Sequence, residues 1–142
     1  VLGTSDFEVL HVVQRIYSEL KDSPDRLKKI DRTVTYQDSC RLGRAEGYTE
    51  EPRQLLKWCG ADVHELPNSR EDTLCCGSGG GVRSAFRDLS FDIAKNLLLQ
   101  TETRDLVTPC PFCAFNLGFT SKSGELNKKV TYISKIIYES LE

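Results

Sequence analysis

The amino-acid sequence predicts an α/β domain of three layers, with a mostly parallel sheet of about four strands and helices on both faces. Two observations lead to this fold class. Short β-branched segments alternate with longer segments whose apolar residues recur at helical spacing, and this pair repeats four times after a first helix. The chain of 142 residues has the size of one domain and shows no internal repeat or low-complexity segment.

The first element is expected to be an amphipathic helix over residues 6–20. Ser5 and Glu8 have the spacing of a capping box, and apolar side chains then recur every three or four residues. The charged stretch 21–32 is expected to be a linker or a short helix. Residues 1–32 are therefore read as a helical lead-in to the sheet, within a single domain spanning 1–142.

The expected strands are short and rich in β-branched or aromatic residues. They are residues 33–36, 61–66, 105–108 and 130–133. The expected helices carry apolar residues on one side, and several start at proline or end near glycine. They are residues 51–60, 84–100, 111–119 and 134–141. Loops are expected over residues 37–43 and 121–127.

Composition narrows the function classes. The net charge of -2 and the lack of a basic stripe argue against a nucleic-acid partner. No apolar run is long enough for a membrane span and the first residues do not resemble a signal peptide, so we expect a cytoplasmic protein. The sequence contains no Met, even at position 1, which favours a piece of a longer protein.

The six cysteines admit three explanations, which are disulfides, structural zinc and a redox cofactor. Disulfide frameworks are typical of small secreted chains with too little core, and this chain has ample core and no secretion signal. Cys75 and Cys76 are adjacent and precede a glycine run. Two neighbouring thiolates on a flexible backbone can face one soft metal centre. Metal or cluster binding is therefore expected.

The predicted strands bring most of the cysteines together. Five of them share a position just after a predicted strand: Cys40, Cys75, Cys76, Cys110 and Cys113. Ligands of open parallel α/β sheets bind beyond the carboxyl ends of the strands, so a site is expected at that edge. Cys59 instead ends a helix and precedes a strand, which places it at the opposite edge. We expect Cys59 not to be a ligand.

Other motifs carry less weight. The glycine run 77–81 resembles a nucleotide-binding loop only superficially, because Val82 stands where a third glycine is needed and no Gly-Lys-Ser/Thr follows. His11 and His64 have no companion at ligand spacing and are expected to be structural. The Cys-x-x-Cys pair alone is also compatible with a thioredoxin-like dithiol, although three further cysteines converge on it.

Three sequence motifs carry a resemblance to a known family. They are Thr35-Tyr36-Gln37-Asp38-Ser39-Cys40-Arg41-Leu42-Gly43-Arg44, Cys75-Cys76-Gly77-Ser78-Gly79-Gly80-Gly81-Val82-Arg83 and Pro109-Cys110-Pro111-Phe112-Cys113. The motifs and their spacing resemble the cysteine-rich CCG domain of heterodisulfide reductases (their B and D subunits) and related iron–sulfur oxidoreductases, over about residues 30–142. The family usually has His and Pro where this chain has Gln37 and Ser39, and neither is expected to be a ligand.

This resemblance implies an iron–sulfur redox module. In heterodisulfide reductases the motif holds a noncubane [4Fe–4S] cluster that delivers electrons to a disulfide substrate. Carried over, the ligands here are Cys40, Cys75, Cys76, Cys110 and Cys113. Residues of the same loops are expected around the cluster or an acidic thiol substrate: Arg41, Arg44, Gly77, Gly79, Gly80, Gly81 and Arg83. No catalytic residue is expected beyond the cluster.

The resemblance also implies a larger assembly. Electrons would arrive from other iron–sulfur or flavin subunits or domains, so the isolated domain is expected to be inactive, and partner subunits could hold it at a membrane. A small disulfide or thiol is the implied substrate. One alternative stays open. Tetrahedral zinc needs only four thiolates, so Cys40, one of the doublet, Cys110 and Cys113 would suffice for a zinc-binding docking domain without chemistry of its own.

Overall fold

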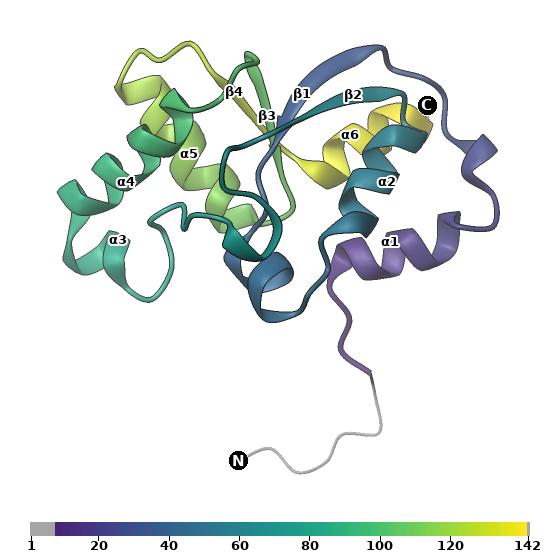
Figure 1. Ribbon diagram of the computed structural model, residues 1–142, viewed down its shortest axis with the longest axis horizontal. Coiled ribbons are helices and arrows are strands. Elements are labelled where there is room, and N and C mark those ends of the chain that lie inside the picture. The colour runs from purple at the N-terminus through teal and green to yellow at the C-terminus, as the bar shows by residue number, and fades with distance from the viewer. Residues whose placement is uncertain (1–7, 142) are drawn as a thin grey trace.

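The computed structural model describes residues 8–141, which form a central sheet with helices on both faces (Figure 1). The strands are β1 (Arg32–Tyr36), β2 (Ala61–Glu65), β3 (Asp105–Thr108) and β4 (Lys129–Tyr132). They lie in the order β2-β1-β3-β4, and every neighbouring pair is parallel. The predicted three-layer α/β fold is confirmed, with a sheet that is parallel throughout.

The helices cover the sheet in two groups. They are α1 (Val12–Leu20), α2 (Glu50–Trp58), α3 (Val82–Ala85), α4 (Arg87–Leu99), α5 (Pro111–Ser123) and α6 (Ile133–Leu141). Figure 1 shows α1, α2 and α6 on one side of the strands and α4 and α5 on the other. One buried cluster joins α1, α2 and α6 to Val34, and a second joins α4 and α5 to Leu106. Burial on both faces explains the β-branched and apolar strands.

The start of α1 differs from the prediction. The side chain of His11 caps the helix, because its Nδ1 accepts the Val13 N–H at 3.2 Å. The His11 N–H in turn donates to Gln14 Oε1 at 2.7 Å, which completes a capping box. Glu8 therefore precedes the helix, and the predicted partner Ser5 lies outside the described residues. The expected structural role of His11 is confirmed.

A π-helix occupies part of the predicted loop after β1. It spans Cys40–Ala45, and the Leu42 N–H donates to Ser39 Oγ at 3.2 Å at its start. Gly43 permits a close approach here, since a Cβ would lie 3.3 Å from the Arg70 carbonyl oxygen. The π-helix thus packs closely against a distant segment, a contact that local sequence does not reveal.

Two later helices also differ from the prediction. The expected helix over 84–100 is divided into α3 and α4, because Phe86 leaves helical geometry with φ -134°. Helix α5 ends at Ser123 rather than at residue 119, so the following loop is shorter than expected. In the described part of the chain no helix is long and apolar enough to cross a membrane.

Candidate metal centre

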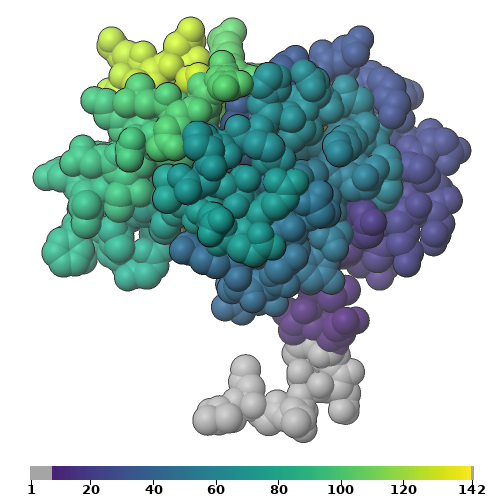
Figure 2. Space-filling model, viewed as in Figure 1, coloured from purple at the N-terminus to yellow at the C-terminus, as the bar shows by residue number. Residues whose placement is uncertain are grey.

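The cysteine loops lie at the carboxyl edge of the sheet. Cys40 begins the π-helix after β1, and Cys110 follows β3 and caps α5. The strands β1 and β3 are neighbours, but the chain continues from them to opposite sides of the sheet, so the crevice between their ends is its topological switch point. Cys75 and Cys76 come from the loop between β2 and α3. Figure 2 shows this teal part of the chain on the face turned to the viewer.

The five thiols of this edge fall into two groups. Cys40 and Cys75 interact through a hydrogen bond and form the first thiol group. Cys113 is hydrogen-bonded to both Cys76 and Cys110, and these three form the second thiol group. Cys76 and Cys113 are buried, Cys75 is exposed, and all five are free thiols. Within residues 8–141, no three His, Cys, Asp or Glu side chains are arranged to hold a metal ion.

Hydrogen bonds between the thiols set their acidities. The bond to Cys113 lowers the pKa of Cys110 to about 6, against the opposing effect of burial. A hydrogen bond from Cys113 also lowers the pKa of Cys76. Because Cys113 donates to both Cys110 and Cys76, its own pKa is raised well above the usual range. Burial raises the pKa of Cys75. Cys76 and Cys110 are therefore the thiols of the second group that ionise most readily, and the thiolate is the form that binds metals.

Gly77 is required at this edge by both its backbone and its surroundings. Its φ is +81°, and a Cβ would lie 2.8 Å from the carbonyl oxygen of Ser90 in α4. The left-handed region favours glycine, and the contact leaves no room for a side chain. Around Gly79, Gly80 and Gly81 no described atom lies within 4 Å of an added Cβ. Gly77 thus holds the cysteine doublet against α4, and the other three glycines face open space.

Backbone donors surround the sulfur atoms. The Gly77 N–H donates to Cys75 Sγ at 3.4 Å, and the Ser78 N–H interacts with Cys76. The backbone N–H groups of Phe112 and Cys113 donate hydrogen bonds to the Cys110 sulfur. The Ser78 hydroxyl is buried without a hydrogen-bond partner among the described residues. Thiols, N–H donors and an unpaired hydroxyl together suit an anionic sulfur-containing group such as an iron–sulfur cluster.

The three arginines predicted near the site have different surroundings. Arg41 is exposed and forms an ion pair with Glu46 at 2.9 Å, and Arg44 is exposed as well. The guanidinium carbon of Arg83 lies 4.8 Å from the ring centre of Phe115 and close to two further phenylalanine rings. Arg83 is therefore held by aromatic side chains. The predicted roles of all three arginines around a bound group stay predictions.

Cys59 lies apart from the other thiols. It caps the C-terminus of α2, directly before β2, and its side chain is fully buried. Burial raises the pKa of its thiol, against a hydrogen bond with Ser140 and the charge of Lys29. The structure therefore places Cys59 at the amino edge of the sheet. Its exclusion from the ligand set stays a prediction.

Three polar residues near the site were not predicted from the sequence. Asp38 and Arg53 form a buried ion pair, with Arg53 Nη2 2.7 Å from Asp38 Oδ2. Asn116, fully buried in α5, donates to the Cys76 carbonyl at 2.7 Å. The sequence could have predicted a buried partner for Arg53. This residue lies on the apolar side of its helix, beside Leu56, and a charged side chain in that position needs a buried partner. Asp38 and Asn116 stand close to cysteines in the sequence and gave no such signal.

An open parallel α/β sheet with five thiols gathered on the loops of its carboxyl edge defines a thiol-rich metal or redox domain. Residues 34–118 match the model of the family described as the CCG cysteine-rich domain. The chain belongs to this family.

Its relatives include named oxidoreductases and iron–sulfur proteins. The chain is 37% identical over 116 residues to the D subunit of dihydromethanophenazine:CoB–CoM heterodisulfide reductase of Methanosarcina acetivorans, covering 78% of this chain and 28% of the relative. It is 30% identical over 152 residues to EtfAB:quinone oxidoreductase of Syntrophomonas wolfei, covering 96% of this chain and 21% of the relative. An uncharacterized iron–sulfur protein of Methanocaldococcus jannaschii is 30% identical over 108 residues, covering 74% and 21%. The chain thus spans less than a third of the length of these three relatives.

Proposed function

We propose that this domain is the iron–sulfur redox module of a larger, heterodisulfide reductase-like oxidoreductase. The observation that carries the proposal is the presence of five free thiols, in two groups, on three loops at the carboxyl edge of the sheet. Membership of the CCG family and the names of the relatives support iron–sulfur chemistry. The finer proposal is a noncubane [4Fe–4S] cluster held by all five of these cysteines.

Cys40, Cys75, Cys76, Cys110 and Cys113 would hold the cluster. When bound, such a group supplies one-electron chemistry at a potential tuned by its surroundings. Because the thiols lie in two groups, binding would draw the first and second thiol groups toward one another. The backbone N–H donors at Gly77 and Ser78 are already directed at sulfur, and they would compensate part of the negative charge.

The surroundings of the thiols give the site a closed side and an open side. Cys76 and Cys113 are buried among the apolar side chains that pack beneath α4 and α5, and this packing excludes water. Cys75 is exposed, and the neighbouring glycines 79–81 leave space beside it. We infer that a small disulfide or thiol substrate, or a partner protein, approaches from the side of Cys75. Electrons would come from other iron–sulfur or flavin subunits or domains, so the domain alone is expected to be inactive.

Reconstitution tests the proposal. Protein purified without oxygen and treated with iron and sulfide should take up about four irons with inorganic sulfide and show a paramagnetic state by EPR. Cys75→Ser or Cys76→Ser should abolish uptake, and Cys59→Ser should leave it intact. Uptake that survives both changes in the doublet, or is lost with Cys59→Ser, contradicts the proposed ligand set.

The alternative is a zinc-stabilised docking domain. The second thiol group is the observation behind it, because Cys113 is hydrogen-bonded to both Cys76 and Cys110; these three would have to rearrange and gain one further thiolate to form a tetrahedral zinc site. This reading predicts one zinc per chain, no sulfide and no cluster after reconstitution. The zinc alternative leaves one of Cys75 and Cys76 without a ligand role, whereas the iron–sulfur proposal uses both as ligands.

A further inference from the structure

A buried ion network lies between the elements that carry the first thiol group. Its centre is Arg53 of α2, which is 2% exposed. The Arg53 guanidinium donates to both carboxylate oxygens of Asp38, at 2.8 and 2.7 Å, and to both of Glu65, at 2.6 and 2.7 Å. Its remaining N–H donates to the Thr49 carbonyl. All five N–H groups are therefore used, which only a planar guanidinium fork can achieve.

Asp38 connects the two loops of the first thiol group. It stands two residues before Cys40 and two residues after the end of β1. Its Oδ2 also accepts the Arg70 N–H at 2.8 Å, and its carbonyl accepts the Thr73 hydroxyl at 2.9 Å. Arg70 and Thr73 belong to the loop that leads from β2 to Cys75. Asp38 thus ties the segment before Cys40 to the segment before Cys75, and Arg53 fixes the Asp38 carboxylate in place.

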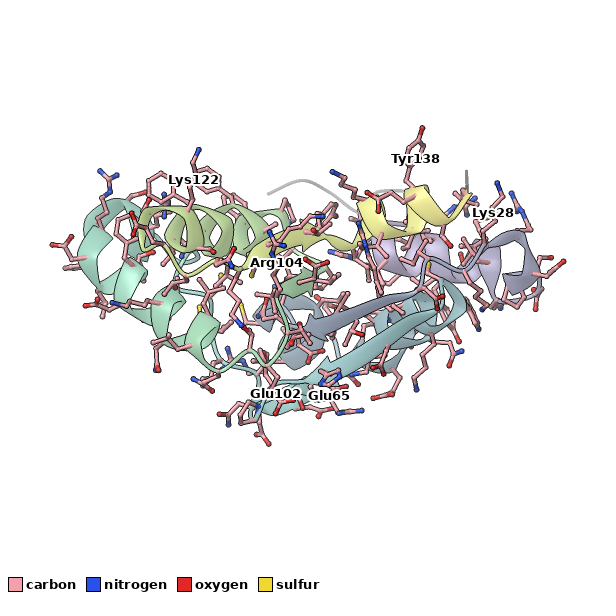
Figure 3. The ribbon with its side chains drawn as sticks, turned by 90° about the horizontal axis from the view of Figure 1, so that it is seen from above. Lys28, Glu65, Glu102, Arg104, Lys122 and Tyr138 are labelled. Atoms are coloured by element: carbon pink, nitrogen blue, oxygen red, sulfur yellow. The ribbon has the colours of Figure 1, made fainter. Side chains whose placement is uncertain are left out.

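The network also reaches the β2 edge of the sheet. Glu65 is the last residue of β2, and Figure 3 shows it on the outer side of that strand. Its pairing with Arg53 joins α2 to the start of the loop that carries Cys75. The loop is therefore held near its beginning by Glu65 and again at Arg70 and Thr73. Three attachments along one loop leave little freedom in the placement of Cys75.

The second thiol group has a separate brace. Asn116 of α5 donates to the Cys76 carbonyl at 2.7 Å and to Ser90 Oγ of α4 at 3.2 Å. The Asn116 side-chain oxygen accepts from Arg83 of α3. This network uses α3, α4 and α5, whereas the Arg53 network uses β1, α2 and β2. The two thiol groups are therefore held by different parts of the fold.

We propose that Arg53 is a positioning residue that holds the loops of Cys40 and Cys75 through Asp38, independently of the second thiol group. The proposal rests on the proposed function only for what the thiols bind, since the network is made entirely of protein groups. Removing one partner of a buried ion pair leaves the other charge uncompensated. Lysine keeps the charge of Arg53 but cannot form both bidentate pairs. Residues 37–45 and 66–75 should then open locally.

Peptide-resolved hydrogen exchange on the metal-free protein tests this. Arg53→Lys should speed exchange of the peptides over 37–45 and 66–75 by about tenfold or more, since local opening sets exchange rates. Peptides over α5 and α6 should keep the parent's rates. The matched control is Arg32→Lys, the same exchange in the half-buried Arg32–Glu139 pair, which has a single contact of 2.8 Å at the other end of β1. The control should leave both loops unchanged.

A second variant and a spectrum complete the test. Thr73→Val removes the tie to the Asp38 carbonyl without touching the ion pair, and it serves if Arg53→Lys does not fold. Thr73→Val should speed exchange over 66–75 alone. After reconstitution, Arg53→Lys should change the EPR line shape, which a purely structural loss of stability would not do. Faster exchange throughout the chain, or unchanged loops in both variants, overturns the proposal. Selective loop opening in a protein that binds only zinc supports the positioning role of Arg53 and refutes the proposed iron–sulfur cluster.

Discussion

Gly77→Ala is the change whose effect on stability follows most directly from the structure. Alanine at φ +81° pays the cost of the left-handed region, about 1–2 kcal/mol. Its Cβ would also lie 2.8 Å from the Ser90 carbonyl oxygen, and such overpacking against backbone costs a further 1–3 kcal/mol, roughly. The sum is about 2–5 kcal/mol, a large part of the stability of an ordinary domain.

Two neighbouring glycines separate these two costs. Gly80 has φ +62° but open space around it, so Gly80→Ala should show the backbone cost alone. Gly79 has open space and no left-handed φ, so Gly79→Ala should be nearly neutral. At about 4 °C per kcal/mol for a chain of this size, the expected falls in Tm are about 8–20 °C for Gly77→Ala and about 4–8 °C for Gly80→Ala.

Thermal unfolding of the metal-free variants, followed by circular dichroism, is the assay. A Gly77→Ala protein no less stable than Gly80→Ala would refute the reasoning from the contact with Ser90. Equal falls for Gly79→Ala and Gly80→Ala would refute the reasoning from φ. Because Cys76 precedes Gly77, the same variant should also reduce iron uptake, whereas Gly79→Ala should not.

Three further predictions concern the hydroxyl beside the doublet, a surface histidine and the metal itself. Ser78→Ala removes a buried hydroxyl without a described partner, so it should leave metal-free stability unchanged or slightly higher. It should also make the midpoint potential of the reconstituted protein more negative, and an unchanged potential argues against a donor role. A hydrogen bond to Glu102 raises the pKa of His64 above 6.5, so Glu102→Gln should lower that pKa in an NMR titration. Since the folded-state pKa is raised, this contact stabilises the fold below the ordinary histidine pKa and is lost as pH rises through the raised value. Removal of bound metal by a chelator should leave the far-ultraviolet circular dichroism unchanged, because the buried cluster around Val34 contains none of the proposed ligands and the one around Leu106 buries only Cys76 and Cys113 among many apolar side chains; unfolding on chelation would contradict this.

Local sequence was sufficient where periodicity decides the structure. The strand Asp105–Thr108 was predicted with its observed bounds, because a short β-branched run between a polar stretch and a proline has few alternatives. The carboxyl-edge position of the five cysteines followed from the strands alone. The parallel order of the sheet followed from the alternation of strands and helices.

Distant contacts decided what the sequence did not predict. No proline or glycine marks the break between α3 and α4 at Phe86, and the helical spacing of apolar residues continues on both sides of it. The pairing of Arg53 with Asp38 and Glu65 joins residues that are adjacent only after three elements assemble. The division of the thiols into two groups has the same origin, because it depends on how the loops pack rather than on their spacing.

The wide spacing of the thiols along the chain bears on how a cofactor reaches this domain. Cys40, Cys75 and Cys110 belong to different strand–helix units, and their loops meet only when β1, β2 and β3 have paired. Closing such long loops is slow compared with forming local helices, so no ligand cage exists on the nascent chain. In contrast to a zinc finger, which folds around its ion, this domain would fold first and be loaded afterwards. Maturation would then be a transfer to a finished protein surface, with exposed Cys75 the first thiol that a delivery protein meets.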